Sequence, residues 1–204
     1  MPRPAQVIRP RIERGRRVVA VSDVHGNLPF LKGVLEKVCF TPRDVLVIVG
    51  DLLEKGWESL ATLRYVLELG RTHTVYTLSG NCDYIDRMLL EGEDPGDGAF
   101  CIKMNRRLGV PADTGLDRQL WTILNLWRER SVLLQMAAEA DIPFPRGPED
   151  LHGLRASLLE RFPRICSWRR SPPQSESFLF SRNFSRPEWQ GFRASSNSCA
   201  PTLR

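Results

Sequence analysis

Three short polar motifs in the first half of the chain contain side chains of the types that commonly bind divalent metal ions. They read DVHGN from Asp23, GD from Gly50 and GNCD from Gly80. Their carboxylate, imidazole and carboxamide groups form a mixed oxygen and nitrogen set that suits Mn, Fe, Zn or a similar divalent ion. One such motif alone is weak, because a strand-end aspartate is often only a helix cap. Three together favour a metal site, with four candidate ligands: Asp23, His25, Asp51 and Asn81.

Each motif directly follows a run of apolar, mostly β-branched residues, at 18–21, 45–49 and 74–78. The runs are nearly continuous and do not alternate with polar residues. This pattern is typical of parallel strands that are buried on both faces.

Helical patterns separate the three predicted strands. Apolar residues recur at helical spacing from Leu31 to Val38, and Asn27 can cap that helix with Pro29 in its first turn. A second helix follows the turn at Gly56. The order predicts an α/β fold, a layered β-α-β-α-β sheet, followed by an α-helical insert.

This fold would bring the motifs together. Ligands of parallel α/β sheets bind beyond the carboxyl ends of the strands, where all three motifs fall. Asp23 and His25 are two residues apart, so an extended segment would point both to one side. Glycines at 26, 50 and 80 suit tight turns beside an ion or a phosphate.

The motif set resembles the calcineurin-like metallophosphoesterases over roughly residues 16–90. The segment GDLLEKG, from Gly50 to Gly56, is similar to the Gly-Asp-x-Val-Asp-Arg-Gly element of the serine/threonine protein phosphatase branch. The resemblance implies hydrolysis of phosphomonoesters or phosphodiesters by a metal-activated water, with two metal ions in the complete family form.

The resemblance also implies metal-binding roles. Asp23 and His25 would bind the first metal, Asp51 would bridge both metals, and Asn81 would bind the second.

It further implies substrate contacts. Lys55 stands at the family's arginine position and would contact the substrate phosphate as a point charge. Asp83 is expected to hold the third loop, and Arg87 to reach the substrate. The partner would be a phosphorylated small molecule or phosphoprotein.

Two departures from the family pattern bear on catalysis. Cys82 replaces a histidine that assists the leaving group in many relatives, and Glu54 stands where that histidine would find its carboxylate partner. Cys82 is either a catalytic proton donor, awkward because a free thiol has a pKa near 8.5, or a small packed side chain.

The family completes its metal shell with later histidines, and only His73 and His152 remain here. We expect His73, at the wrong end of the sheet, to be structural, and His152 to be a surface residue. The alternative function is therefore a non-catalytic or truncated relative that binds metal without efficient hydrolysis.

The rest of the chain divides at changes in composition. We expect the α/β core at 16–90, a helical insert at 91–163 and an irregular tail at 164–204. Within the insert, apolar spacing from Leu120 to Leu134 predicts one long helix, and a shorter helix follows from Leu151 to Phe162. The tail is rich in Ser, Pro and Arg, which fits either disorder or a frameshift product.

Charge and composition disfavour several other classes of protein. The net charge of +5 comes largely from arginines near both ends, which we expect to be solvated, and no RNP or zinc-finger pattern supports nucleic acid as a partner. No apolar run approaches the roughly 20 residues of a membrane span, and the five cysteines form no C-x-x-C pair. These features predict a cytoplasmic protein.

Overall fold

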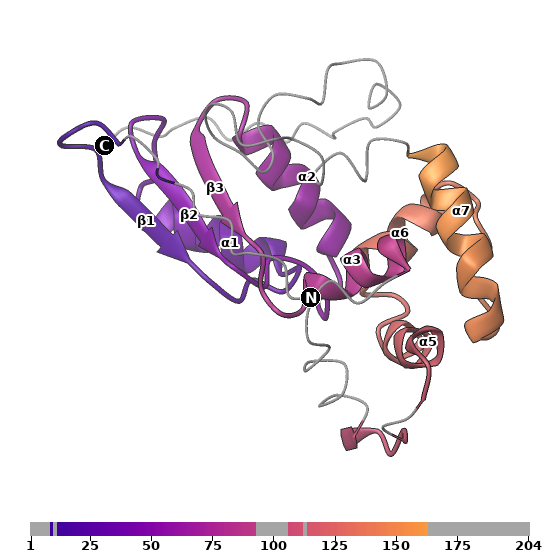
Figure 1. Cartoon of the computed structure of the whole chain (residues 1–204). Helices are drawn as coiled ribbons and strands as arrows, with labels where there is room; N and C mark the ends of the chain where they lie inside the picture. The colour runs from indigo at the N-terminus through magenta and orange to yellow at the C-terminus, as the bar shows by residue number, and fades with distance from the viewer. Residues whose placement is uncertain (1–8, 10–11, 93–105, 112–113, 163–204) are drawn as a thin grey trace.

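The computed structural model describes residue 9 and residues 12–92, 106–111 and 114–162. A parallel sheet of three strands in the order β1-β2-β3 forms one side of this part (Figure 1). The strands and their first helices are β1 (Val18–Val21), α1 (Leu28–Lys37), β2 (Val45–Val49), α2 (Ser59–Leu69), β3 (Thr74–Leu78) and α3 (Tyr84–Glu91). The predicted strands and the predicted α/β order are confirmed.

Both crossover helices pack on the same face of the sheet. The strand order runs in one direction, so two right-handed crossovers place α1 and α2 on one side, where they contact each other. Asn27 caps α1 as predicted, because its Oδ1 accepts the Phe30 N–H at 3.0 Å. Leu46 and Ile48 of β2 are buried in the core that these helices cover.

The prediction that the strands are buried on both faces holds at the start of β2, where Val45 and Leu46 point to opposite faces and are both buried, but not at the strand ends. Val18, Val49 and Leu78 lie exposed at strand ends, and no described helix covers them. The same-side crossovers are the physical reason, since they place both α1 and α2 on one face and leave the other face without a crossover helix in the described part of the chain.

The second half of the described chain is helical and packs beyond α2 and α3, away from β1 (Figure 1). Its apolar side chains join those of the sheet in one continuous core. It comprises α5 (Leu116–Leu126), α6 (Val132–Glu139), the 3₁₀ turn η1 (Pro148–Asp150) and α7 (Leu151–Arg161). The domain boundaries at 90/91 and 163/164 stay predictions, and residues 163–204 lie outside the described residues.

The single long helix predicted from Leu120 to Leu134 is wrong. The chain leaves the helical conformation between α5 and α6, and Ser131 is extended with ψ of 129°. Contacts with the loop after β2 hold this break. Glu54 accepts the Val132 N–H at 2.7 Å, and Ser59 donates to the Arg130 carbonyl at 2.7 Å.

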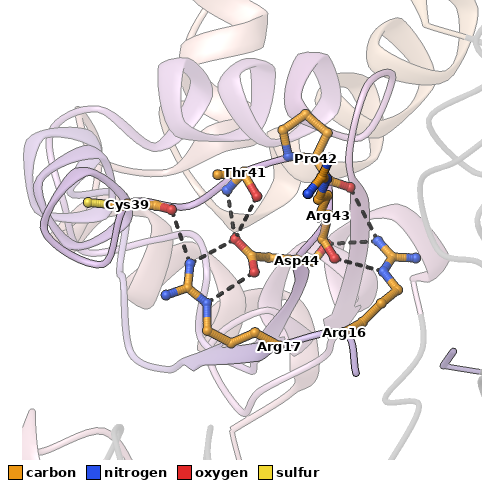
Figure 2. Close-up of polar contacts among 7 residues, drawn as sticks. All are labelled: Arg16, Arg17, Cys39, Thr41, Pro42, Arg43 and Asp44. Carbon is orange, nitrogen blue, oxygen red and sulfur yellow. Dashed lines mark hydrogen bonds and ion pairs between the residues drawn. The ribbon is translucent and has the colours of Figure 1, made fainter. Parts of the chain in front are cut away.

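Two arginines fasten the amino-terminal edge of the sheet (Figure 2). Arg17 forms a bidentate pair with Asp44 at 3.0 and 2.8 Å and also donates to the Cys39 carbonyl. Arg16 donates to the Asp44 carbonyl at 2.9 Å. Asp44 is buried and also accepts the Thr41 N–H. At Arg16 and Arg17 the basic amino-terminal end is therefore not a free tail, although the Arg17 side chain stays 50% exposed.

Candidate metal centre

The loops after β1 and β2 continue the hydrogen-bond pattern of the sheet beyond the strands. The His25 N–H donates to the Asp51 carbonyl at 2.9 Å, and the Gly26 N–H donates to the Leu52 carbonyl at 2.8 Å. Asp23 N–H reaches the Gly50 carbonyl at 3.3 Å. These bonds fix the two motifs next to each other at the carboxyl edge.

Asp83 ties the third loop to the second. Its carboxylate accepts the N–H groups of Gly80, Asp51 and Leu53 at 2.8, 3.0 and 3.3 Å. Burial raises the pKa of Asp83, although the three donors act in the opposite direction. This geometry agrees with the holding role expected for Asp83, and it leaves a catalytic role untested.

The imidazole of His25 lies between two carboxylates. Its Nε2 is 3.8 Å from Asp23 Oδ1 and 3.7 Å from Asp51 Oδ2. Atoms bound to one ion at about 2.0–2.2 Å cannot lie more than about 4.4 Å apart, and both separations meet that limit. Asp23 is 67% exposed and Asp51 is 11% exposed, so the set spans from solvent to interior. Each carboxylate is therefore close enough to His25 to share a divalent cation with it, and these oxygen and nitrogen donors suit such an ion.

Cys82, which the sequence analysis associated with the site, lies beside the same set. One donor atom each from His25, Asp51 and Cys82 lies within 4.8 Å of the other two, so the thiol adjoins the candidate metal ligands. The Cys82 N–H donates to Asp51 Oδ1 at 2.9 Å, and exposed Asn81 donates its Nδ2 to Cys82 Sγ at 3.3 Å.

The thiol of Cys82 is fully buried. Burial raises the pKa of Cys82 to about 12, with the neighbouring Asp51 adding to the effect and Lys55 opposing it. A thiol with so high a pKa is a weak acid, which weakens the case for it as a proton donor.

The predicted site residues share an uncommon backbone conformation. Asp23, His25, Asp51 and Lys55 have φ of 53°, 48°, 50° and 65°. Non-glycine residues with positive φ are a small minority in proteins, and they concentrate at functional sites, where the surrounding contacts hold the strain. Here the bonds between the loops supply those contacts.

Gly80 is required by the close approach of its backbone to Asp51. A Cβ at this position would lie 2.0 Å from Asp51 Oδ1 and 2.3 Å from Asp51 N. Any side chain here would therefore displace the carboxylate or the loop.

The other candidate residues are placed as follows. Lys55 Nζ lies 3.4 Å from His25 Nε2, so its ammonium adjoins the donor set. The side chain of Arg87 lies outside the described residues. His73 precedes β3 and stacks on Phe40 with ring centroids 5.2 Å apart, and His152 is exposed in α7.

Glu54 turns away from the donor set and into the core. Its side chain is 0% exposed, and Oε1 accepts the Val132 N–H at the start of α6. Burial raises the pKa of Glu54 to about 8, and the charge of Asp83 adds to this. Burial also raises the pKa of Asp86, its buried neighbour. Because Cys82 replaces the histidine that Glu54 would otherwise pair with, the Glu54 carboxyl has no such partner here. It instead connects the β2 loop to α6.

The fold and this site together define a class. The chain belongs to the calcineurin-like phosphoesterases, a family of hydrolases, whose family model matches residues 16–179. Among curated proteins, the chain is 46% identical over 67 residues to a protein of Thioalkalivibrio sulfidiphilus named "Bis(5'-nucleosyl)-tetraphosphatase, symmetrical". Proteins of the same name from Shewanella sp. (strain W3-18-1) and Dechloromonas aromatica are 48% identical over 64 residues and 40% identical over 74 residues.

These similarities cover only part of each protein. The three alignments cover 32%, 31% and 36% of this chain and 24%, 23% and 26% of the respective relatives. The chain thus matches about a quarter of the length of these relatives. No solved structure is significantly similar to it. None of the described helices has the length and apolar character of a membrane span.

Proposed function

We propose that this chain carries a metal-dependent phosphoesterase site that hydrolyses phosphomonoesters or phosphodiesters. The observation that supports it most is the position of His25 Nε2, 3.7–3.8 Å from carboxylates of two different loops. Left-handed backbone at Asp23, His25 and Asp51 aims these groups at one another. The family membership favours this function over the alternative of a non-catalytic relative.

Each group of the chain has a distinct proposed task. Asp23, His25 and Asp51 would hold the metal, with Asn81 at the exposed side. A bound divalent ion would supply an acidified water and neutralise developing negative charge. Lys55 would bind a non-bridging phosphate oxygen as a compact positive charge.

The raised pKa of Cys82 bears on which leaving groups the site can release. A thiol that stays protonated at neutral pH donates a proton poorly. The site is therefore better suited to leaving groups that depart as stable anions, as phosphates do, than to alkoxides. The relatives are named for cleaving nucleosyl tetraphosphates, and we propose dinucleoside polyphosphates as the first substrate class to test.

The test is turnover of 4-nitrophenyl phosphate and bis(4-nitrophenyl) phosphate by the full chain during titration with Mn²⁺, Fe²⁺ or Zn²⁺. Asp51→Asn should lower metal-dependent turnover roughly 100-fold or more, because a metal ion contributes several kcal/mol of charge stabilisation. The matched control is Asp117→Asn, the same change on the exposed face of α5, which should retain activity.

Two results would contradict the proposal. Turnover that persists in Asp51→Asn or in excess EDTA would mean that this carboxylate and a metal are not needed. Metal binding without any turnover would support the non-catalytic alternative instead.

A further inference from the structure

Trp57 is the most exposed large hydrophobic residue in the described part of the chain, at 62%. Its neighbour Gly56 presses against the first loop of the candidate metal centre. A Cβ on Gly56 would lie 1.9 Å from the His25 carbonyl oxygen. The indole therefore projects from a segment that touches the donor set. Single exposed apolar residues are common on proteins, so the exposure needs further support.

The backbone that carries Trp57 is held on both sides. Gln135 Nε2 donates to the Trp57 carbonyl at 2.9 Å, and Gln135 Oε1 accepts the Leu60 N–H at 2.7 Å. One side chain of α6 thus fastens the segment before and after Ser59. An exposed aromatic ring on a fixed backbone is preorganised for binding, because little conformational freedom is lost when a ligand stacks on it.

Arg130 adds positive charge to this exposed ring. Its guanidinium carbon lies 4.2 Å from the centroid of the Trp57 indole. The Arg130 backbone is also fixed, since its carbonyl accepts the Ser59 hydroxyl at 2.7 Å. Because Trp57 remains 62% exposed, Arg130 covers only part of the ring. Lys55, two residues before Trp57, provides a second cation next to His25.

We infer that Trp57 and Arg130 form a base-binding platform, on which the nucleobase of a nucleoside phosphate stacks while its phosphate lies at Lys55 and the donor set. The platform combines an aromatic face, which stacks any base, with the Arg130 guanidinium, which adds a cation–π contribution to stacking. This inference rests on the proposed function and adds the residues that would make the site prefer nucleotides to other phosphate esters.

The experiment compares two ribose 5-phosphates, one with the base on C1 and one with a hydroxyl group there. Isothermal titration calorimetry of the full chain with Mn²⁺ would measure the Kd of adenosine 5′-monophosphate and of ribose 5-phosphate. Stacking of one base is worth roughly fivefold to 100-fold in affinity, so the wild type should prefer the adenosine ligand by at least about fivefold. Trp57→Ala should remove this preference and leave the Kd of ribose 5-phosphate unchanged, whereas Trp57→Phe should keep most of it.

The matched control is Leu126→Ala, which removes another exposed apolar side chain, from α5, and should leave the preference intact. The inference is overturned if the wild type shows no preference, if neither ligand binds at millimolar concentration, or if Trp57→Ala keeps the preference. Calorimetry needs no turnover, so the two proposals fail separately. A Trp57-dependent preference without hydrolysis would refute the enzyme alone, and hydrolysis without that preference would refute the platform alone.

Discussion

Replacement of Glu54 by glutamine should flatten the pH dependence of stability. Burial and the charge of Asp83 raise the pKa of Glu54 from 4.5 to about 8 in the folded chain. Between these two pH values the folded state holds a proton that the unfolded state has released. The free energy of unfolding should therefore decrease as pH rises, by up to about 1.4 kcal/mol per pH unit from this group. From pH 5.5 to 7.5 the loss amounts to at most about 3 kcal/mol.

Glutamine has nearly the same shape as a protonated glutamate, and its Oε1 can still accept the Val132 N–H. Because the amide does not titrate, Glu54→Gln should lack this share of the slope. Urea unfolding at pH 5.5, 6.5 and 7.5, with EDTA to exclude metal effects, gives the free energies. Glu54 contributes to the raised pKa of Asp86, so the difference between the two slopes reports the titration of the Glu54–Asp86 pair.

Glu36→Gln, the same change on the exposed surface of α1, is the control and should leave the slope as in the wild type. If wild type and Glu54→Gln lose stability equally from pH 5.5 to 7.5, Glu54 is already ionised in the folded state. The account of it as a buried neutral carboxyl would then be wrong.

Three further perturbations test other parts of the structure. Asp44→Asn should lower the free energy of unfolding at neutral pH. The Arg17 guanidinium, and then the Thr41 N–H, hold the pKa of Asp44 well below its usual range. The stabilisation is present above the unfolded pKa near 4 and is lost as pH falls below it. Acid unfolding followed by circular dichroism should therefore begin at higher pH in the variant, and its stability should depend less steeply on pH. An unchanged unfolding profile contradicts the Arg17–Asp44 pairing. Gly80→Ala should lower Mn²⁺ affinity at least about tenfold in a calorimetric titration, since its Cβ would fall 2.0 Å from Asp51 Oδ1, and equal affinity would show that the loop adapts. Iodoacetamide at pH 8 should alkylate exposed Cys39 in the native protein and buried Cys82 only after unfolding, as read by peptide mass mapping; rapid labelling of native Cys82 would refute its raised pKa.

The local sequence was sufficient for the first 80 residues of the fold. The three apolar runs form strands at the predicted residues, and the Asn27 cap starts α1 where predicted. These features depend on side-chain chemistry within a few residues, so neighbouring sequence carries the information. The convergence of the motifs also followed, because parallel strands end at a common edge.

Predictions that depended on distant partners were less reliable. The apolar spacing from Leu120 to Leu134 is helical, but hydrogen bonds from Glu54 and Ser59 hold the chain in a break between α5 and α6. Arg16 and Arg17 belong to a basic amino-terminal segment, and only the fold reveals that Asp44 and its neighbouring carbonyls bind them. In each case the deciding contact joins residues far apart in sequence.

The sequence by itself determined the strand positions, the parallel α/β order and which side chains gather at the carboxyl edge, since periodicity and motif spacing encode them locally. The tertiary structure decided which groups within that edge face one another. It placed Cys82 beside His25 and Asp51, turned Glu54 into the core and left Trp57 exposed. Packing between loops and helices sets those orientations, and side chains at identical spacing can point either way until that packing forms.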